Sequence, residues 1–167
     1  MGRIKIGGVM QSDGRSMIRL TARPEQPGSA GGVMGLLGGL GINIEFLVAS
    51  CGPDDCSHLT MCVDGRDLEA TLAGLDEAKE RLGLENISCQ PEVVVMSIYG
   101  PHFREKPRIA GVMFSALARA GVKVSAVSTS ISSISCVIRA EDRAAVLQVL
   151  GDSFDIPQHI KNRPKDY

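Results

Sequence analysis

The chain of 167 residues is 44% hydrophobic and 22% charged, and its formal net charge is -1. This composition is that of a globular protein with one domain or two small ones. It argues against a nucleic-acid-binding role, because the chain has no basic excess and only four Phe and two Tyr to stack on bases.

The N-terminal residues and the cysteines bear on where the protein works. The start, MGRIKI, has no long apolar core followed by a small-residue cleavage site, so no secretion signal is expected. Five cysteines occur without CxxC spacing, which favours unpaired thiols in a reducing cytoplasm. Cys51, Cys56 and His58 could ligate a metal ion, but a fourth ligand is not evident. We therefore expect a cytoplasmic protein with no metal and no cofactor.

The first half of the chain predicts a β-α-β-β-α-β unit preceded by one extra strand. Alternating apolar and polar residues mark two early strands. The turn sequence CGPDDCS separates two later strands, and Asp67 is expected to cap the second helix. The predicted elements are strands at residues 3–6, 17–22, 42–49, 59–63 and 86–89, and helices at residues 29–40 and 67–82.

Seven glycines lie between residues 28 and 41. The stretch is too poor in bulky apolar residues to span a membrane, which takes ~20 of them. It also lacks the GxGxxG and GxxxxGK patterns of phosphate-binding loops. We predict a helix that is entered through residues 27–29 and ends near Gly41. For four glycines inside it, close helix packing is the favoured role: Gly31, Gly35, Gly38 and Gly39.

The second half of the chain repeats the first at a spacing of eighty residues. Gly31 aligns with Gly111 and Gly41 with Gly121. Further on, HLTMCVDGRDLEATL aligns with SISCVIRAEDRAAVL, with five residues fewer in the turn. A register kept through helix, strand, strand and helix indicates a duplicated domain. The predicted elements here are strands at residues 93–97, 122–128 and 134–138, and helices at residues 108–120 and 142–150.

Two ferredoxin-like βαββαβ domains of the α+β class fit this order, each with an antiparallel sheet and two helices on one face. The second repeat lacks a fourth strand, whereas the strand at residues 3–6 is spare. We therefore predict that the N-terminal strand completes the second domain. The first domain would comprise residues 12–91, and the second would comprise residues 1–11 plus 92–167.

Two segments carry a family resemblance. The first repeat reads Pro24-Glu25-Gln26-Pro27-Gly28, then a helix, then GINIEFLV. The second reads IAGVMFSALARAGVKVSAVSTSISSISCVIRAED. Together they resemble the tandem ACT regulatory region of aspartate kinases over nearly the whole chain. The resemblance implies an allosteric, amino-acid-binding regulator of lysine, threonine or methionine biosynthesis, without the kinase catalytic domain. It would act as a free-standing regulator or as the regulatory subunit of a kinase.

The resemblance also implies a homodimer that binds an amino-acid effector where the loop before one helix meets a strand start of the partner chain. Glycine lets the backbone approach a ligand closely, and the free N–H groups of a helix N-terminus suit a carboxylate. The candidate ligand-binding residues lie in two loops and at two strand starts: Glu25, Gln26, Pro27, Gly28, Ser29 and Ala30; Asn43 and Ile44; Phe103 and Arg104; and Lys123 and Val124.

The two kinds of site differ in charge. One arrangement places Lys123 opposite Glu25, and these charges could satisfy each other and fill the space of a ligand. The other places Asn43, which can donate and accept hydrogen bonds, opposite a loop that carries Arg104 and Lys106. We predict that binding depends on Asn43 and survives Lys123→Ala, and that an anionic or neutral ligand is favoured over lysine.

Two other classes of function stay open on the sequence. An enzyme on a ferredoxin-like fold is disfavoured, because the His and Cys residues show no nucleophile and base arrangement. A degenerate ACT pair could instead serve as a dimerisation or interaction module without a ligand. Besides the effector and a second copy of the chain, a kinase catalytic subunit is the one other partner that we consider; we expect neither nucleic acid nor membrane.

Overall fold

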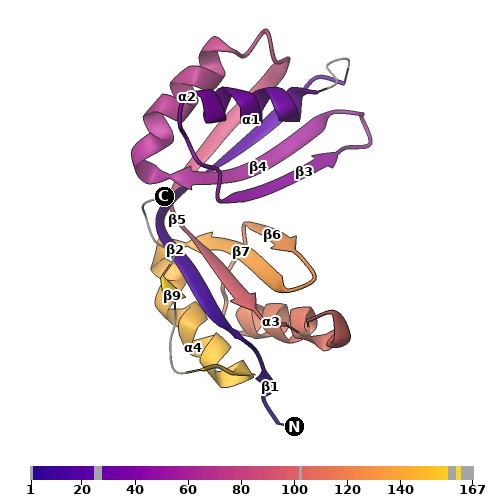
Figure 1. Cartoon of the computed structure of the whole chain (residues 1–167), viewed down its shortest axis with the longest axis vertical. Helices are drawn as coiled ribbons and strands as arrows, with labels where there is room; N and C mark the ends of the chain where they lie inside the picture. Colours follow the sequence, from indigo (N-terminus) through magenta and orange to yellow (C-terminus); the bar gives the residue numbers. More distant parts are fainter. Residues whose placement is uncertain (1, 25–27, 102, 158–160, 163–167) are drawn as a thin grey trace. The chain divides into compact units, whose positions relative to one another are not determined.

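The chain folds into two compact units (Figure 1). The computed structural model describes residues 2–24, 28–101, 103–157 and 161–162. The inserted unit is Gly14–Glu92, and the split unit combines Met1–Asp13 with Val93–Tyr167. None of the helices in the described part of the chain is long and apolar enough to cross a membrane.

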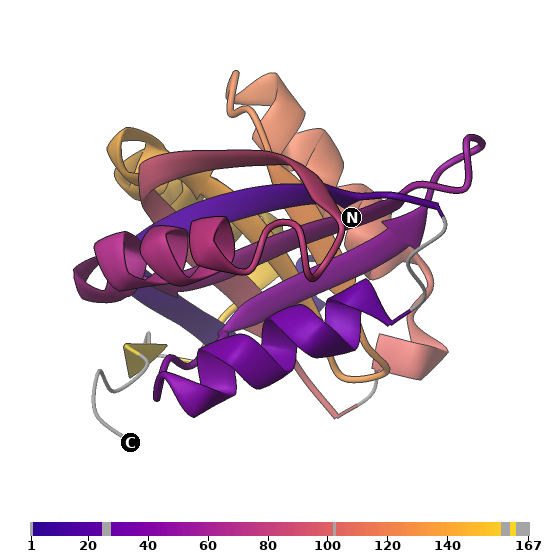
Figure 2. The same ribbon diagram turned by 90° about the horizontal axis from the view of Figure 1, so that it is seen from above.

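The inserted unit is an antiparallel sheet with two helices. Its strand order is β3-β4-β2-β5, and in its centre Met17 lies opposite Cys62, which in turn lies opposite Phe46. Helix α1 runs alongside the strands of this unit in both ribbon views (Figure 1 and Figure 2). In chain order the elements are β2 (Gly8–Ala22), α1 (Ser29–Gly39), β3 (Phe46–Cys51), β4 (Ser57–Asp64), η1 (Gly65–Asp67), α2 (Leu68–Glu77) and β5 (Leu84–Tyr99).

The split unit repeats this plan with the strand order β2-β5-β7-β6. Strands β5 and β7 pair antiparallel, with Met96 opposite Cys136. After β5 the elements are η2 (Phe103–Glu105), α3 (Arg108–Arg119), β6 (Ala126–Thr129), β7 (Ser133–Arg139), η3 (Ala140–Asp142), α4 (Arg143–Ser153), β8 (Phe154–Asp155) and β9 (Lys161–Asn162), and β1 (Ile4–Lys5) opens the chain.

The N-terminal part of the chain completes the sheet of the split unit, but it does so through residues 8–13 of β2 and not through the predicted strand at residues 3–6, where β1 pairs with β8 in a separate sheet. The N–H of Gly7 donates to the carbonyl of Tyr99 at 2.7 Å, and Val9 is fully buried in the core of this unit. The expectation of no strand beyond Leu150 was wrong. Strand β8 pairs parallel with β1, and β9 pairs parallel with β2. These strands of two residues are too short to show any alternation.

Strand β5 differs from the prediction of two strands at residues 86–89 and 93–97. It runs unbroken from Leu84 to Tyr99 and passes from the inserted unit into the split unit. Pro91 lies inside this strand although proline has no N–H to donate. Proline is tolerated where a strand needs no donor on one side, and the ladder between β5 and β7 begins only at Val93.

The two repeats end their first helices in the same way, eighty residues apart. Gly41 and Gly121 both have left-handed backbones, with φ of 72° and 73°. The N–H of Ile42 donates to Leu37 O at 2.9 Å, and the N–H of Val122 donates to Leu117 O at 3.0 Å. This hydrogen bond, made after a left-handed glycine, is the Schellman helix ending. The duplication read from the sequence is therefore also present in the backbone geometry.

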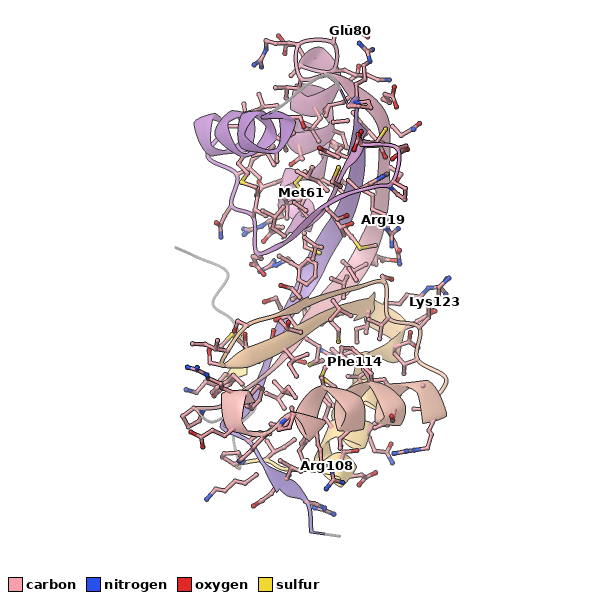
Figure 3. All side chains as sticks on the ribbon, turned by 90° about the vertical axis from the view of Figure 1, so that its right-hand side faces the viewer. Arg19, Met61, Glu80, Arg108, Phe114 and Lys123 are labelled. Atoms are coloured by element: carbon pink, nitrogen blue, oxygen red, sulfur yellow. The ribbon has the colours of Figure 1, made fainter. Side chains whose placement is uncertain are left out.

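Each unit has its own core. In the inserted unit, Ile18, Leu37 and Met61 are completely buried, and Figure 3 labels Met61 among the side chains inside this unit. In the split unit, Met96 and Met113 are likewise completely buried. Alternation along the strands and the apolar positions of the helices supply these side chains, so each unit buries a core despite its small size.

The glycines of α1 do not pack as the sequence suggested. A methyl group placed on Gly31, Gly35, Gly38 or Gly39 would meet nothing within 4 Å among the described residues. Only Gly32 is crowded within this helix, because its methyl group would lie 2.5 Å from Leu82 Cδ2. The four open glycines therefore leave one face of α1 without a neighbour in the described chain.

Candidate ligand-binding site

The N-terminus of α1 has no side-chain cap among the described residues. The first N–H groups of a helix have no acceptor within the helix, and α1 begins at Ser29 with no acidic residue in its first turn. Gly28 precedes it with φ 85°, and its carbonyl accepts the N–H of Gly32 at 2.9 Å. Such a helix end attracts a carboxylate. Ser29 is buried and Ala30 is half-buried.

Three predicted ligand residues of this loop, Glu25, Gln26 and Pro27, lie outside the described residues. The geometry of the first loop is therefore given by its last three residues, Gly28, Ser29 and Ala30.

Asn43 and Ile44 follow the other end of α1. Ile44 packs against the core of the inserted unit, whereas Asn43 is exposed. The Asn43 side chain makes no hydrogen bond to a described residue. The amide of Asn43 is therefore available to a ligand or to another chain.

Next to Asn43 and Ile44 lies a buried ionic cluster that the sequence analysis missed. Arg15 is 1% exposed, and its guanidinium lies 2.6 Å from Glu45 Oε1 and 2.8 Å from Asp64 Oδ2. Arg15 Nε and Glu45 Oε2 are both buried without a hydrogen-bond partner among the described residues. The cluster ties the segment that carries Asn43 to β2 and β4.

Asp64 also accepts hydrogen bonds from Arg66. Its Oδ1 accepts the Arg66 backbone N–H at 2.9 Å, and its Oδ2 accepts the Arg66 guanidinium at 3.1 Å. The side-chain hydrogen bond from Arg66, helped by the backbone hydrogen bond and the charge of Arg15, lowers the pKa of Asp64 to about 2. Asp64 is therefore ionised at all physiological pH values.

The loop of the second repeat is built differently. Phe103 lies in the 3-10 turn η2 and points into the core, where it is 9% exposed, while Arg104 is exposed. The carbonyl of Lys106 accepts the N–H of Ile109 at 3.1 Å, so one donor of the first turn of α3 is already used. Pro107 precedes α3 with φ -62°, so this loop has no left-handed residue comparable to Gly28.

Lys123 and Val124 occupy the positions of Asn43 and Ile44 in the second repeat. Lys123 is exposed, and Val124 packs against the core of the split unit. Figure 3 shows Lys123 at the surface of this unit, and Phe114 of α3 on its inner side.

Within one unit the predicted site residues do not meet. In the inserted unit, Gly28 precedes α1 and Asn43 follows it, so the eleven residues of this helix separate them. At 1.5 Å per residue this is roughly 16 Å. In the split unit, the twelve residues of α3 separate Phe103 from Lys123, a span of roughly 18 Å. Neither unit alone therefore assembles a complete loop and strand site.

The hairpin between β3 and β4 carries the three residues considered as metal ligands, Cys51, Cys56 and His58. Cys51 is exposed, Cys56 is buried, and His58 Nδ1 lies 3.4 Å from Thr21 Oγ1. No group of three His, Cys, Asp or Glu among the described residues could hold a metal ion. All five cysteines are free thiols.

Comparison with known proteins shows what the chain is similar to. Residues 96–154 match the family model described as ACT domain. Aspartokinase 2 of Bacillus subtilis is 28% identical over 118 residues, which are 71% of this chain and 29% of that protein. The chain thus spans less than a third of that aspartokinase.

Solved structures agree. The ligand-free regulatory subunit of aspartate kinase from Thermus thermophilus has a TM-score of 0.80 at 25% identity, and the match covers 90% of this chain and 99% of that subunit. The aspartate kinase of Synechocystis has a TM-score of 0.86 at 22% identity over 97% of this chain and 28% of that protein, which shows the shared fold.

The chain has a ferredoxin-like fold, and residues 96–154 are similar to ACT domains. More narrowly, this chain resembles the regulatory region of aspartate kinases and corresponds to their regulatory part, as its sequence predicted.

Proposed function

We propose that this chain binds a small amino acid and transmits its presence as an allosteric regulator of the aspartate kinase type. The observation that carries this proposal is the match to a free-standing regulatory subunit over 99% of that subunit's length. The N-terminus of α1, which has left-handed Gly28, no side-chain cap among the described residues and no acid in its first turn, supports it, because it suits the carboxylate of an amino acid.

The complete site is proposed to form between two copies of the chain. Since the loop and the strand start lie at opposite ends of a helix in each unit, a second loop or strand start must be supplied from elsewhere. Strands β3 and β6 each pair with one neighbour only among the described strands. Unpaired strand edges favour pairing with another chain, and a two-fold homodimer covers them.

Calorimetric titration of the purified chain with each of the twenty amino acids tests the proposal. We expect saturable binding of one or a few of them. If none of the twenty amino acids gives a binding signal, the ligand-binding proposal is contradicted. The remaining hypothesis is then a degenerate ACT pair that serves as an interaction module.

The proposed macromolecular partner is the catalytic part of an aspartate kinase in the cytoplasm of the same cell. Mixing this chain with that kinase and measuring sedimentation and kinase rate tests the partnership. A complex whose rate responds to the amino acid identified by calorimetry is expected. Two separate sedimenting species and an unchanged rate would show that the chain acts without the kinase.

A further inference from the structure

The split unit contains a cavity of about 420 Å³ that shares two residues, Phe103 and Lys106, with the loop of the second repeat. Small-molecule sites in proteins have volumes of roughly 300–1,000 Å³. Apart from two prolines, its walls come from the N-terminal strand and from the turn before α3: Lys5, Ile6, Gly7, Gly100, Phe103 and Lys106.

Close backbone packing builds the walls in advance of any ligand. The N–H of Gly7 donates to the Tyr99 carbonyl at 2.7 Å. A methyl group on Gly100 would lie 2.7 Å from Phe103 Cε1 and 3.1 Å from Gly7 N. The two glycines thus let the strand and the turn touch, and they hold the ring of Phe103 in place.

The cavity combines apolar walls with positive charge. Ile6 and Phe103 are almost fully buried side chains that line it. Lys106 Nζ donates to the carbonyl of Lys5 at 3.1 Å, and a lysine ammonium has two further N–H groups to donate. Among the described residues that line the cavity, the two charged ones are Lys5 and Lys106. Asp155 lies opposite Lys5 in the ladder of β1 and β8, so Lys106 is the cation better placed to meet an anion.

We propose that this cavity binds a small organic acid without an amino group. The carboxylate pairs with Lys106, and the apolar body covers Ile6 and Phe103, which removes their exposed atoms from water. A free amino acid fits less well, because its ammonium group would face two lysines. The proposed ligand thus differs in chemistry from an amino acid, and neither Asn43 nor the N-terminus of α1 lines this cavity. It therefore places a second input on the same regulator.

The probe for this site is 3-phenylpropionate, followed through the backbone amide resonances of Gly7, Gly100 and Phe103 in the labelled full-length protein. Saturable shifts at these three residues are expected. Neutral 3-phenylpropanamide and L-phenylalanine, which adds an ammonium, are expected to bind at least roughly ten-fold more weakly, since a hydrogen bond between charged groups is lost or opposed. Equal affinity for the acid and the amide would overturn the proposal.

A set of lysine variants tests whether the Lys106 ammonium is the group that binds the carboxylate of the probe. Lys106→Met is expected to weaken 3-phenylpropionate roughly ten-fold or more, Lys106→Arg to retain most of the affinity, and Lys79→Met, in the inserted unit, to leave it unchanged. Wild-type affinity in Lys106→Met, or the absence of saturable shifts at the three residues in the wild-type protein, would refute the site. Either result leaves the calorimetric test of amino-acid binding standing, because that test rests on Asn43 and the N-terminus of α1, which do not line this cavity.

Discussion

Arg15 is the residue on which the geometry around Asn43 most depends. Its side chain is 1% exposed, and its guanidinium forms ion pairs with Glu45 and Asp64. Without Arg15, Asp64 would keep its contacts with Arg66, but the Glu45 carboxylate, whose side chain is 11% exposed, would lose its cation. Breaking such a buried pair costs roughly 3–5 kcal/mol. We expect Arg15→Met to lower the free energy of unfolding by about that amount, measured by urea denaturation.

The control for Arg15 is Arg66→Met. Arg66 also contacts Asp64, but its side chain is 68% exposed, and such surface pairs contribute only ~0–1 kcal/mol. If both variants lost the same stability, burial would not be the source of the effect.

Asp64 makes stability depend on acid pH. Its folded pKa of about 2 lies below the ~3.9 of an unfolded aspartate, so its contribution is fully present above pH ~4 and is lost as the pH falls toward 2. We expect the stability advantage of the wild type over Asp64→Asn to be constant from pH 7 to 5 and to shrink between pH 4 and 2. Urea denaturation at each pH measures it. An advantage that does not change down to pH 2 would mean that the pKa of Asp64 is not depressed.

Among the secondary-structure elements, helix α1 has one face, formed by Gly31, Gly35, Gly38 and Gly39, that no other described residue covers. Because a methyl group on Gly35 would meet nothing in the described chain, Gly35→Ala should only reduce the freedom of the unfolded chain and improve helix propensity, for a gain of roughly 0.5–1 kcal/mol. Thermal unfolding measures this gain. Gly41→Ala is the opposing control, because its φ of 72° disfavours any side chain by ~1–2 kcal/mol. A loss of stability in Gly35→Ala that depends on protein concentration would instead place another copy of the chain against this face.

The strand starts decide which kind of amino-acid site is functional. We keep the prediction that Asn43→Ala weakens the best amino acid roughly ten- to a hundred-fold, because a hydrogen bond to a charged ligand is worth ~1.5–3 kcal/mol. Lys123→Ala is predicted to bind normally. Calorimetric titration of both variants is the measurement, and the reverse pattern would assign the site to the other loop.

Sequence patterns predicted most of the helices and strands. Features that depend on local backbone chemistry could be predicted, whereas features that depend on long-range pairing could not. The helix endings at Gly41 and Gly121 follow from local backbone chemistry, so they can be read from a single glycine. The cluster around Arg15 cannot be read in this way. Arg15 lies opposite Asp64 only in the register of β2 and β4, forty-nine residues apart in the chain. Long-range register and the tail strands depend on tertiary pairing, which local alternation does not encode.

For the whole molecule, the central prediction is self-association. Because each unit holds only part of a loop and strand site and the sheets keep unpaired edges at β3 and β6, we expect a homodimer with twice the chain mass of 17.7 kDa. Sedimentation equilibrium measures it. A mass of one chain at every concentration would contradict both the dimer and a site shared between copies.

The split unit also sets an order of events during protein synthesis. Residues 2–13 leave the ribosome before the entire inserted unit, yet the partners of β1 in β8 are made only after it, since Ile4 pairs with Phe154. Contacts at such sequence separation form late, and domains made as continuous segments fold as they emerge. The inserted unit can therefore fold first, while residues 2–13 wait as an unpaired edge that must be protected until the second repeat has been made.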